Sequence, residues 1–167
     1  TSLPGQFMTV ELKQLLLDIE VKLLEQLLRL DPRNARYSTQ LTEVRQQLSK
    51  GEPKVSNAQV AINNETAAQA ARRQLSDLMQ LLEAACSGGM LDGQAYQHWA
   101  RQIRQHQVET TLTMYRALAE AAMREGKPRV AKLQYERAVD YLSKQRSGVH
   151  ADQMAVFRHL LIQAEQT

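Results

Sequence analysis

The apolar residues near the start of the chain follow the period of an α-helix. Between Thr9 and Leu30 a leucine or isoleucine recurs every three or four residues, which keeps one face apolar. This stripe consists of Leu12, Leu16, Ile19, Leu23, Leu27 and Leu30. Further leucines beside it widen the face beyond a coiled-coil seam, so we expect neighbours on more than one side. Those neighbours are either the rest of the chain or a second copy of it.

The same spacing predicts five further helices. They cover residues 35–49, a segment from Ser56 to about Cys86, and residues 94–124, 128–145 and 149–165. Ser56 and Gln59 have the spacing of a capping box, and Gly88 is expected to be a left-handed cap. No stretch alternates apolar and polar residues as a strand does. The sequence therefore predicts an all-α fold, with about six helices in an antiparallel bundle or array.

The segment "KGEPKVSN" interrupts the helical pattern and is the best candidate for a linker. It divides the chain into an N-terminal helical hairpin, residues 8–50, and a C-terminal helical bundle, residues 57–167. A single continuous domain is the alternative. Within the long fourth helix, "RQHQVETT" is polar on nearly every face. We expect that stretch to be solvated, covered by a partner, or bent.

Composition adds the cellular setting. Cys86 is the only cysteine, which excludes an intramolecular disulfide and a cysteine-based zinc cluster and fits a reducing, cytoplasmic location. No apolar run is long enough to span a bilayer. The chain begins "TSLPG" without a methionine, which fits either a cleaved tag or a fragment of a larger protein. If that protein is membrane-anchored, a membrane surface becomes a possible partner.

Residues 112–145 carry the most specific pattern in the chain. Tyr115 precedes the pair Leu118 and Ala119, a Gly-Lys-Pro turn follows, and Ala131, Tyr135 and Ala138 then have the A-x3-F-x2-A spacing. These residues resemble one hairpin of a tetratricopeptide repeat. Two positions depart from the family pattern, because Ala122 replaces the second aromatic residue and Ser143 replaces the final proline. Convergent packing of two helices would produce the same spacing.

The resemblance implies a protein-interaction role and a set of peptide-facing positions. On this chain they are Thr113, Arg116, Glu120, Met123 and Arg124. Two arginines on one helix face can each bind a carboxylate with two hydrogen bonds. The alternative is that Arg116 and Arg124 both pair with Glu120, which lies four residues from each.

Catalytic patterns are missing from the sequence. It contains no G-x-S-x-G, no S-x-x-K and no phosphate-binding glycine loop. The four histidines do not have metal-ligand spacing. Cys86 follows two alanines and Trp99 lies on an apolar stripe, so we expect both in the core. We therefore expect no cofactor and no metal, and a non-enzymatic interaction or scaffold module that binds a protein partner or itself as a homodimer. An enzyme with an unfamiliar site between helices is a remaining hypothesis.

A basic cluster supports a different class of function. It consists of Arg101, Arg104, Lys127, Arg129 and Lys132. Such residues can contact phosphates, so the alternative function is a basic helical domain that binds nucleic acid or an anionic membrane surface. Glu120, Glu125 and Glu136 interleave with the cluster, and no aromatic ladder accompanies it. We therefore expect nucleic acid to be the less favoured partner.

Overall fold

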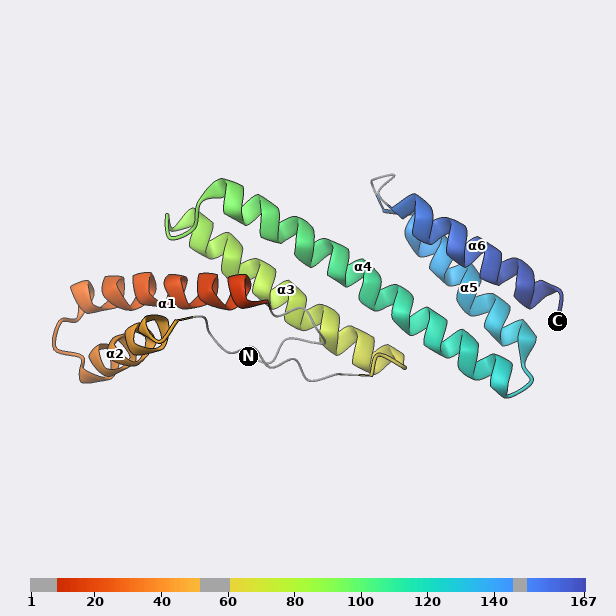
Figure 1. Cartoon of the computed structure of the whole chain (residues 1–167), viewed down its shortest axis with the longest axis horizontal. Coiled ribbons are helices and arrows are strands. Elements are labelled where there is room, and N and C mark those ends of the chain that lie inside the picture. Colours follow the sequence, from red (N-terminus) through yellow and green to blue (C-terminus); the bar gives the residue numbers. More distant parts are fainter. Residues whose placement is uncertain (1–8, 52–60, 146–149) are drawn as a thin grey trace. The chain divides into compact units, whose positions relative to one another are not determined.

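The computed structural model describes residues 9–51, 61–145 and 150–167, and these form six α-helices and no strand (Figure 1). The helices are α1 (Val10–Leu30), α2 (Ala35–Ser49), α3 (Glu65–Ser87), α4 (Gly93–Arg124), α5 (Pro128–Ser143) and α6 (Ala151–Glu165). The predicted all-α fold is confirmed. The bounds of every helix except α3 agree with the predicted ones to within two residues.

Side-chain caps set the starts of three helices. The Thr9 hydroxyl accepts a hydrogen bond from the Leu12 N–H at 3.1 Å, and Asn34 Oδ1 accepts from Arg36 and Tyr37. At α3 it is Asn64 Oδ1 that accepts, from the Ala67 N–H at 2.8 Å. The start of α3 therefore lies later in the chain than predicted. The predicted capping box of Ser56 and Gln59 falls outside the described residues.

Glycines end α3 and α4 with the same hydrogen-bond pattern. At the end of α3, Gly89 donates to the Cys86 carbonyl at 3.1 Å and Met90 donates to the Ala85 carbonyl at 2.8 Å. This Schellman arrangement needs a left-handed residue, which is Gly89 with φ +74°, so the prediction of Gly88 was wrong by one residue. Gly126, with φ +70°, has the same role after α4.

Contacts group the chain into two units. The first consists of Thr1–Val60 with Gln74–Ile103, and the second of Ala61–Arg73 with Arg104–Thr167. Helices α3 and α4 contribute residues to both units. The linker predicted between residues 50 and 57 falls mainly on residues outside the described part, so the division into a hairpin and a bundle stays a prediction.

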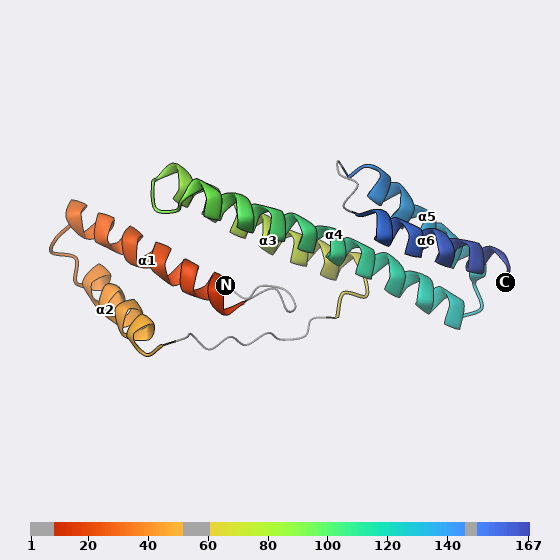
Figure 2. The same ribbon diagram turned by 45° about the horizontal axis from the view of Figure 1, so that its top comes forward.

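In the first unit, α1 contributes to two apolar clusters. Leu12 and Ile19 pack with residues of α3 and α4, while Leu17 and Leu24 pack with Leu41 and other residues of α2. Helices α1 and α2 lie side by side as a hairpin (Figures 1 and 2). The two clusters explain why the apolar face of α1 is so wide. The stripe was wrong at two positions, because Leu23 and Leu30, the last residue of α1, are exposed.

The core of the second unit combines small residues, larger aliphatic side chains and two aromatic rings. Five buried alanines, Ala119, Ala122, Ala131, Ala138 and Ala164, leave room for the helices to approach closely. The rings of Tyr135 and Phe157 lie 6.4 Å apart, centre to centre. Helices α5 and α6 lie side by side in both views (Figures 1 and 2), and Lys132 Nζ lies 3.0 Å from Glu165 Oε1 across them.

Candidate functional site

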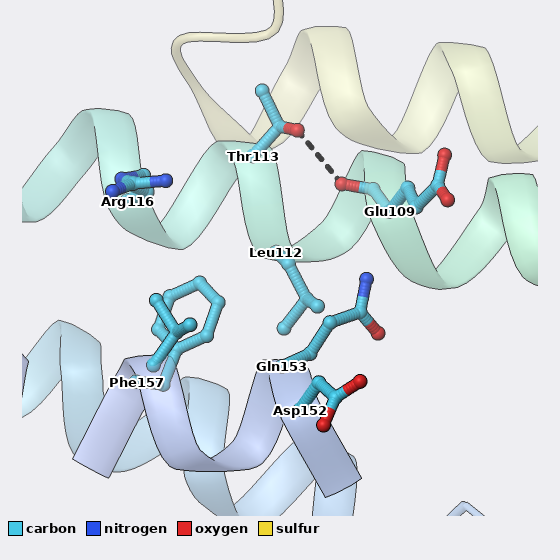
Figure 3. Close-up of a pocket in the computed structure, with 8 residues that line it drawn as sticks. Glu109, Leu112, Thr113, Arg116, Asp152, Gln153 and Phe157 are labelled. Atoms are coloured by element: carbon cyan, nitrogen blue, oxygen red, sulfur yellow. Dashed lines mark hydrogen bonds between the residues drawn. The ribbon is translucent and has the colours of Figure 1, made fainter. Parts of the chain in front are cut away.

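An open groove of about 420 Å³ lies between α4 and α6 in the second unit (Figure 3). Helix α4 lines it with Glu109, Leu112, Thr113 and Arg116, and α6 lines it with Asp152, Gln153, Val156 and Phe157. On α4 these positions follow one another at intervals of three or four residues, or lie directly beside such a position, so they share one helix face.

The floor of the groove is part of the core. Leu112 and Phe157 are only 4% and 5% exposed, and both belong to the central cluster of the second unit. Val156 differs from them, since 47% of its surface is exposed. The groove therefore combines a floor held in place by core packing with an apolar side chain that is still open to solvent.

Charged groups occupy the two ends of the groove. Figure 3 shows Glu109, Gln153 and Asp152 toward one end, and Arg116 with Phe157 toward the other. Asp152 is in the first turn of α6, where the partial positive charge of a helix N-terminus favours a carboxylate. The Arg116 Nε atom lies 3.4 Å from Glu120 Oε1, and both side chains are about half exposed.

Three contacts involve Glu109. Its carboxylate oxygen Oε1 accepts a hydrogen bond from the Gln105 side-chain amide at 3.3 Å. Its backbone carbonyl accepts a hydrogen bond from the Thr113 hydroxyl at 2.8 Å, the dashed line in Figure 3. Its carboxylate lies 3.8 Å from the His106 ring nitrogen, which is near the outer limit of an ion pair and matters only when His106 is protonated. The Thr113 hydroxyl proton is thus committed to its own helix, whereas the Glu109 carboxylate faces solvent.

The structure brings some of the predicted partner-binding residues into the groove and leaves others outside its lining. Thr113 and Arg116 line it. Glu120 pairs with Arg116, Met123 packs against the core of the second unit, and Arg124 is the exposed last residue of α4. Of the two ion pairs expected at Glu120, only the one with Arg116 forms among the described residues.

Helix α6 supplies half of the groove, and sequence reasoning did not identify its contribution. Phe157 shares the helical spacing of an apolar stripe formed by Met154, Phe157, Leu161 and Ala164, whereas Val156 lies outside that stripe. Val156, an apolar residue outside that stripe, was the one sequence signal of the contribution that α6 makes to the groove. The sequence could not show which helix would face Thr113 and Arg116, because helix periodicity identifies an apolar face without naming its neighbour.

Nearby carboxylates offset part of the positive charge of the predicted basic cluster. Lys127 Nζ lies 2.8 Å from Glu125, and Lys132 lies 3.0 Å from Glu165 and 3.8 Å from Glu136. Hydrogen bonding to Lys127 is the main reason why the pKa of the Glu125 carboxyl lies below its usual value, and Arg124 adds a smaller electrostatic effect. These pairs reduce the positive charge available to phosphates.

The other members of the cluster are dispersed. Arg129 and Lys132 line a second hollow of about 400 Å³ beside the end of α6. Arg104 is exposed on α4 in the second unit, whereas Arg101 belongs to the first unit. We therefore find weaker support for a phosphate-binding surface than for the groove.

The cysteine, the tryptophan and two of the histidines lie in core packing or beside a glutamine side chain. Cys86 and Trp99 are partly buried against the core of the first unit, as predicted. His150 and His159 lie within hydrogen-bonding distance of Gln153 and Gln163. Across the ranges that the structure describes, no three His, Cys, Asp or Glu side chains are grouped so as to hold a metal ion. None of the helices formed by those ranges combines the length and apolar character that crossing a membrane requires.

The tetratricopeptide resemblance rests on the spacing within residues 112–145, and that spacing corresponds to the end of α4, the turn at Gly126 and helix α5. A relation of this hairpin to the tetratricopeptide family stays a prediction, and convergent packing of two helices stays the alternative. Comparisons of the chain with protein-family models, with curated proteins and with solved structures found no match.

Proposed function

We propose that this chain is a non-enzymatic helical module that binds a segment of another protein in the groove between α4 and α6. The observation that carries the proposal is the position of Val156, half exposed above the buried floor of Leu112 and Phe157. An apolar centre surrounded by polar groups is the usual anatomy of a protein interface. Such a centre gains free energy when a partner side chain removes it from water.

The tetratricopeptide resemblance supports the same surface on separate grounds. Thr113 and Arg116 are two of the positions that it implies for peptide contact, and both line the groove. The two positions come from the residue pattern of 112–145, which includes neither Val156 nor any other residue of α6. It therefore adds an argument from the sequence to the argument from packing.

The open form of the groove favours a peptide over a small molecule. Small-molecule sites enclose most of the ligand surface, whereas this groove runs open between two helices. Its volume of about 420 Å³ suits a few side chains of a partner segment. We place the module in the cytoplasm, or in a cytoplasmic part of a larger protein, because a lone cysteine fits a reducing compartment.

A selection experiment tests this function. Random short peptides displayed on phage are selected on the immobilised full chain, and the enriched peptides are synthesised for fluorescence-polarisation titrations. Val156→Glu places a charge in the groove and should abolish their binding. Ile162→Glu is the matched control, because Ile162 is also on α6 and 51% exposed but does not line the groove.

The two variants separate the outcomes. Binding that is lost in V156E and kept in I162E supports the proposed function. Two results would overturn it: no peptide is enriched, or the enriched peptides bind V156E as well as the unaltered chain. Circular dichroism of both variants shows that any loss of binding is not a loss of fold.

A further inference from the structure

We infer that the partner segment is cationic, with a lysine or arginine close to the apolar side chain that contacts Val156. This inference rests on the proposed function and specifies the chemistry of the partner. It is carried by the juxtaposition of two carboxylates from different helices, Glu109 on α4 and Asp152 on α6, at one end of an apolar groove.

The acidic end has little compensation within the protein. Both carboxylates are on exposed residues and line the groove. No cationic side chain in the described ranges forms an ion pair with Asp152. Glu109 has His106 at 3.8 Å and accepts a hydrogen bond from the neutral Gln105 amide, which leaves its negative charge in place. A lysine or arginine brought by a partner would therefore meet two negative charges.

The opposite end does not reverse this preference. The Arg116 guanidinium lies 3.4 Å from the Glu120 carboxylate, so its charge is already offset. Three carboxylates, Glu109, Asp152 and Glu120, thus stand against one guanidinium in and beside the groove, an excess of two negative charges. An acidic segment would be repelled, and a basic one attracted and guided to the groove.

The helix spacing limits how far apart the two partner residues can be. Glu109 and Leu112 are one helical turn apart on α4, so the acidic end is next to the apolar floor. In an extended peptide, an apolar anchor on the floor and a basic residue two positions away can reach the floor and the acidic end together. In a helical peptide, the basic residue does so from three or four positions away. We therefore expect a basic residue within about four positions of the anchor.

Charge-exchanged peptides test the inference on the full chain. The tightest peptide from the selection is synthesised with lysine, glutamine or glutamate at its positions flanking the apolar anchor. We expect affinity to fall in the order lysine, glutamine, glutamate, by about fivefold per step for charges that remain partly solvated. The differences should shrink as salt is added, because salt screens exposed charges.

A charge-matched pair of variants locates the effect. In the double variant Glu109→Gln with Asp152→Asn, the affinities of the lysine and glutamine peptides should lie within about twofold of each other. Asp77→Asn with Glu83→Gln is the control, since it removes the same charge from exposed positions of α3 that do not line the groove. That control should keep the preference for lysine.

The outcomes distinguish this inference from the function on which it rests. If V156E abolishes binding but the three peptides bind equally, the inference is wrong and the groove still binds a partner. If the preference for lysine survives in E109Q/D152N, the cation is bound elsewhere and the inference is also wrong. If no selected peptide depends on Val156, the proposed function fails and the inference fails with it.

Discussion

At the scale of single residues, two leucines of α1 have the same side chain and opposite surroundings. Leu12 is fully buried between α1, α3 and α4, whereas Leu30 is 84% exposed. We expect Leu12→Ala to lower the free energy of unfolding by about 2–5 kcal/mol, because it leaves a cavity in the core. Leu30→Ala should change it by less than about 0.5 kcal/mol. Urea unfolding followed by circular dichroism measures both, and equal effects would contradict the described core.

Tyr135 shows how burial affects an ionisable group. Burial raises the pKa of its phenol from the usual value of 10.0, the Glu120 carboxylate raises it further, and Arg116 opposes the shift. Because the folded-state pKa is above the unfolded one, Tyr135 stabilises the fold fully below pH 10 and loses that contribution as the pH rises through the raised pKa.

Alkaline titration followed by phenolate absorbance tests the surroundings of Tyr135. We expect a late ionisation step above the usual phenol pKa of 10.0, and Tyr135→Phe should remove this late step. If Y135F leaves the late step in place, another tyrosine is the buried one. The other tyrosines of the variant provide the internal reference.

At the scale of helices, the turn after α4 depends on a left-handed glycine. Gly126 has φ +70°, and a Cβ added there would meet no atom within 4 Å, so an alanine would be strained only through its backbone. We expect Gly126→Ala to destabilise the protein by about 1 kcal/mol or slightly more. Gly93→Ala is the control, because Gly93 is in α4, has no positive φ, and is equally open.

Thermal unfolding compares these glycine variants. A clearly lower melting temperature for G126A than for G93A is the expected result. Equal melting temperatures would show that the turn between α4 and α5 does not need the left-handed conformation.

The sequence predicted which segments are helical more reliably than it predicted how α3 ends or which helices are neighbours. Leucine spacing and Pro128 predicted most bounds, because both act locally. Two adjacent glycines follow α3, and the prediction of Gly88 was wrong because only the backbone shows that Gly89 has the left-handed conformation. The polar stretch "RQHQVETT" contains Thr110 and Thr111, which are buried with their hydroxyls donating to carbonyls of their own helix. Polarity alone could not reveal that burial.

The residues of the candidate site also divide into those that a local pattern predicted and those that it did not. Thr113 and Arg116 were predicted from the tetratricopeptide resemblance and line the groove, whereas Asp152 and Val156 were not predicted. The first pair follows from a spacing along one helix. The second pair depends on how α6 packs beside α4, which is a long-range property that no local pattern contains.

At the scale of the whole molecule, the structure provides partners within the chain for the apolar face of α1. Two clusters use that face, so pairing with a second copy is not needed to cover it. We expect sedimentation equilibrium to give the mass of a single chain at all concentrations. A concentration-dependent dimer that Leu23→Glu dissociates would instead show that α1 forms the interface, since Leu23 is 43% exposed on that helix.

The central claim is that the groove between α4 and α6 binds a partner segment, and methyl nuclear magnetic resonance of the full chain tests it most directly. The titrant is the tightest lysine-containing peptide from the selection. We predict that the methyl signals of Leu112 and Val156, which line the groove, shift with peptide concentration, and that the Ile162 signals stay unchanged. Unchanged signals from Leu112 and Val156, with shifts at Ile162 or in the first unit, would contradict the account.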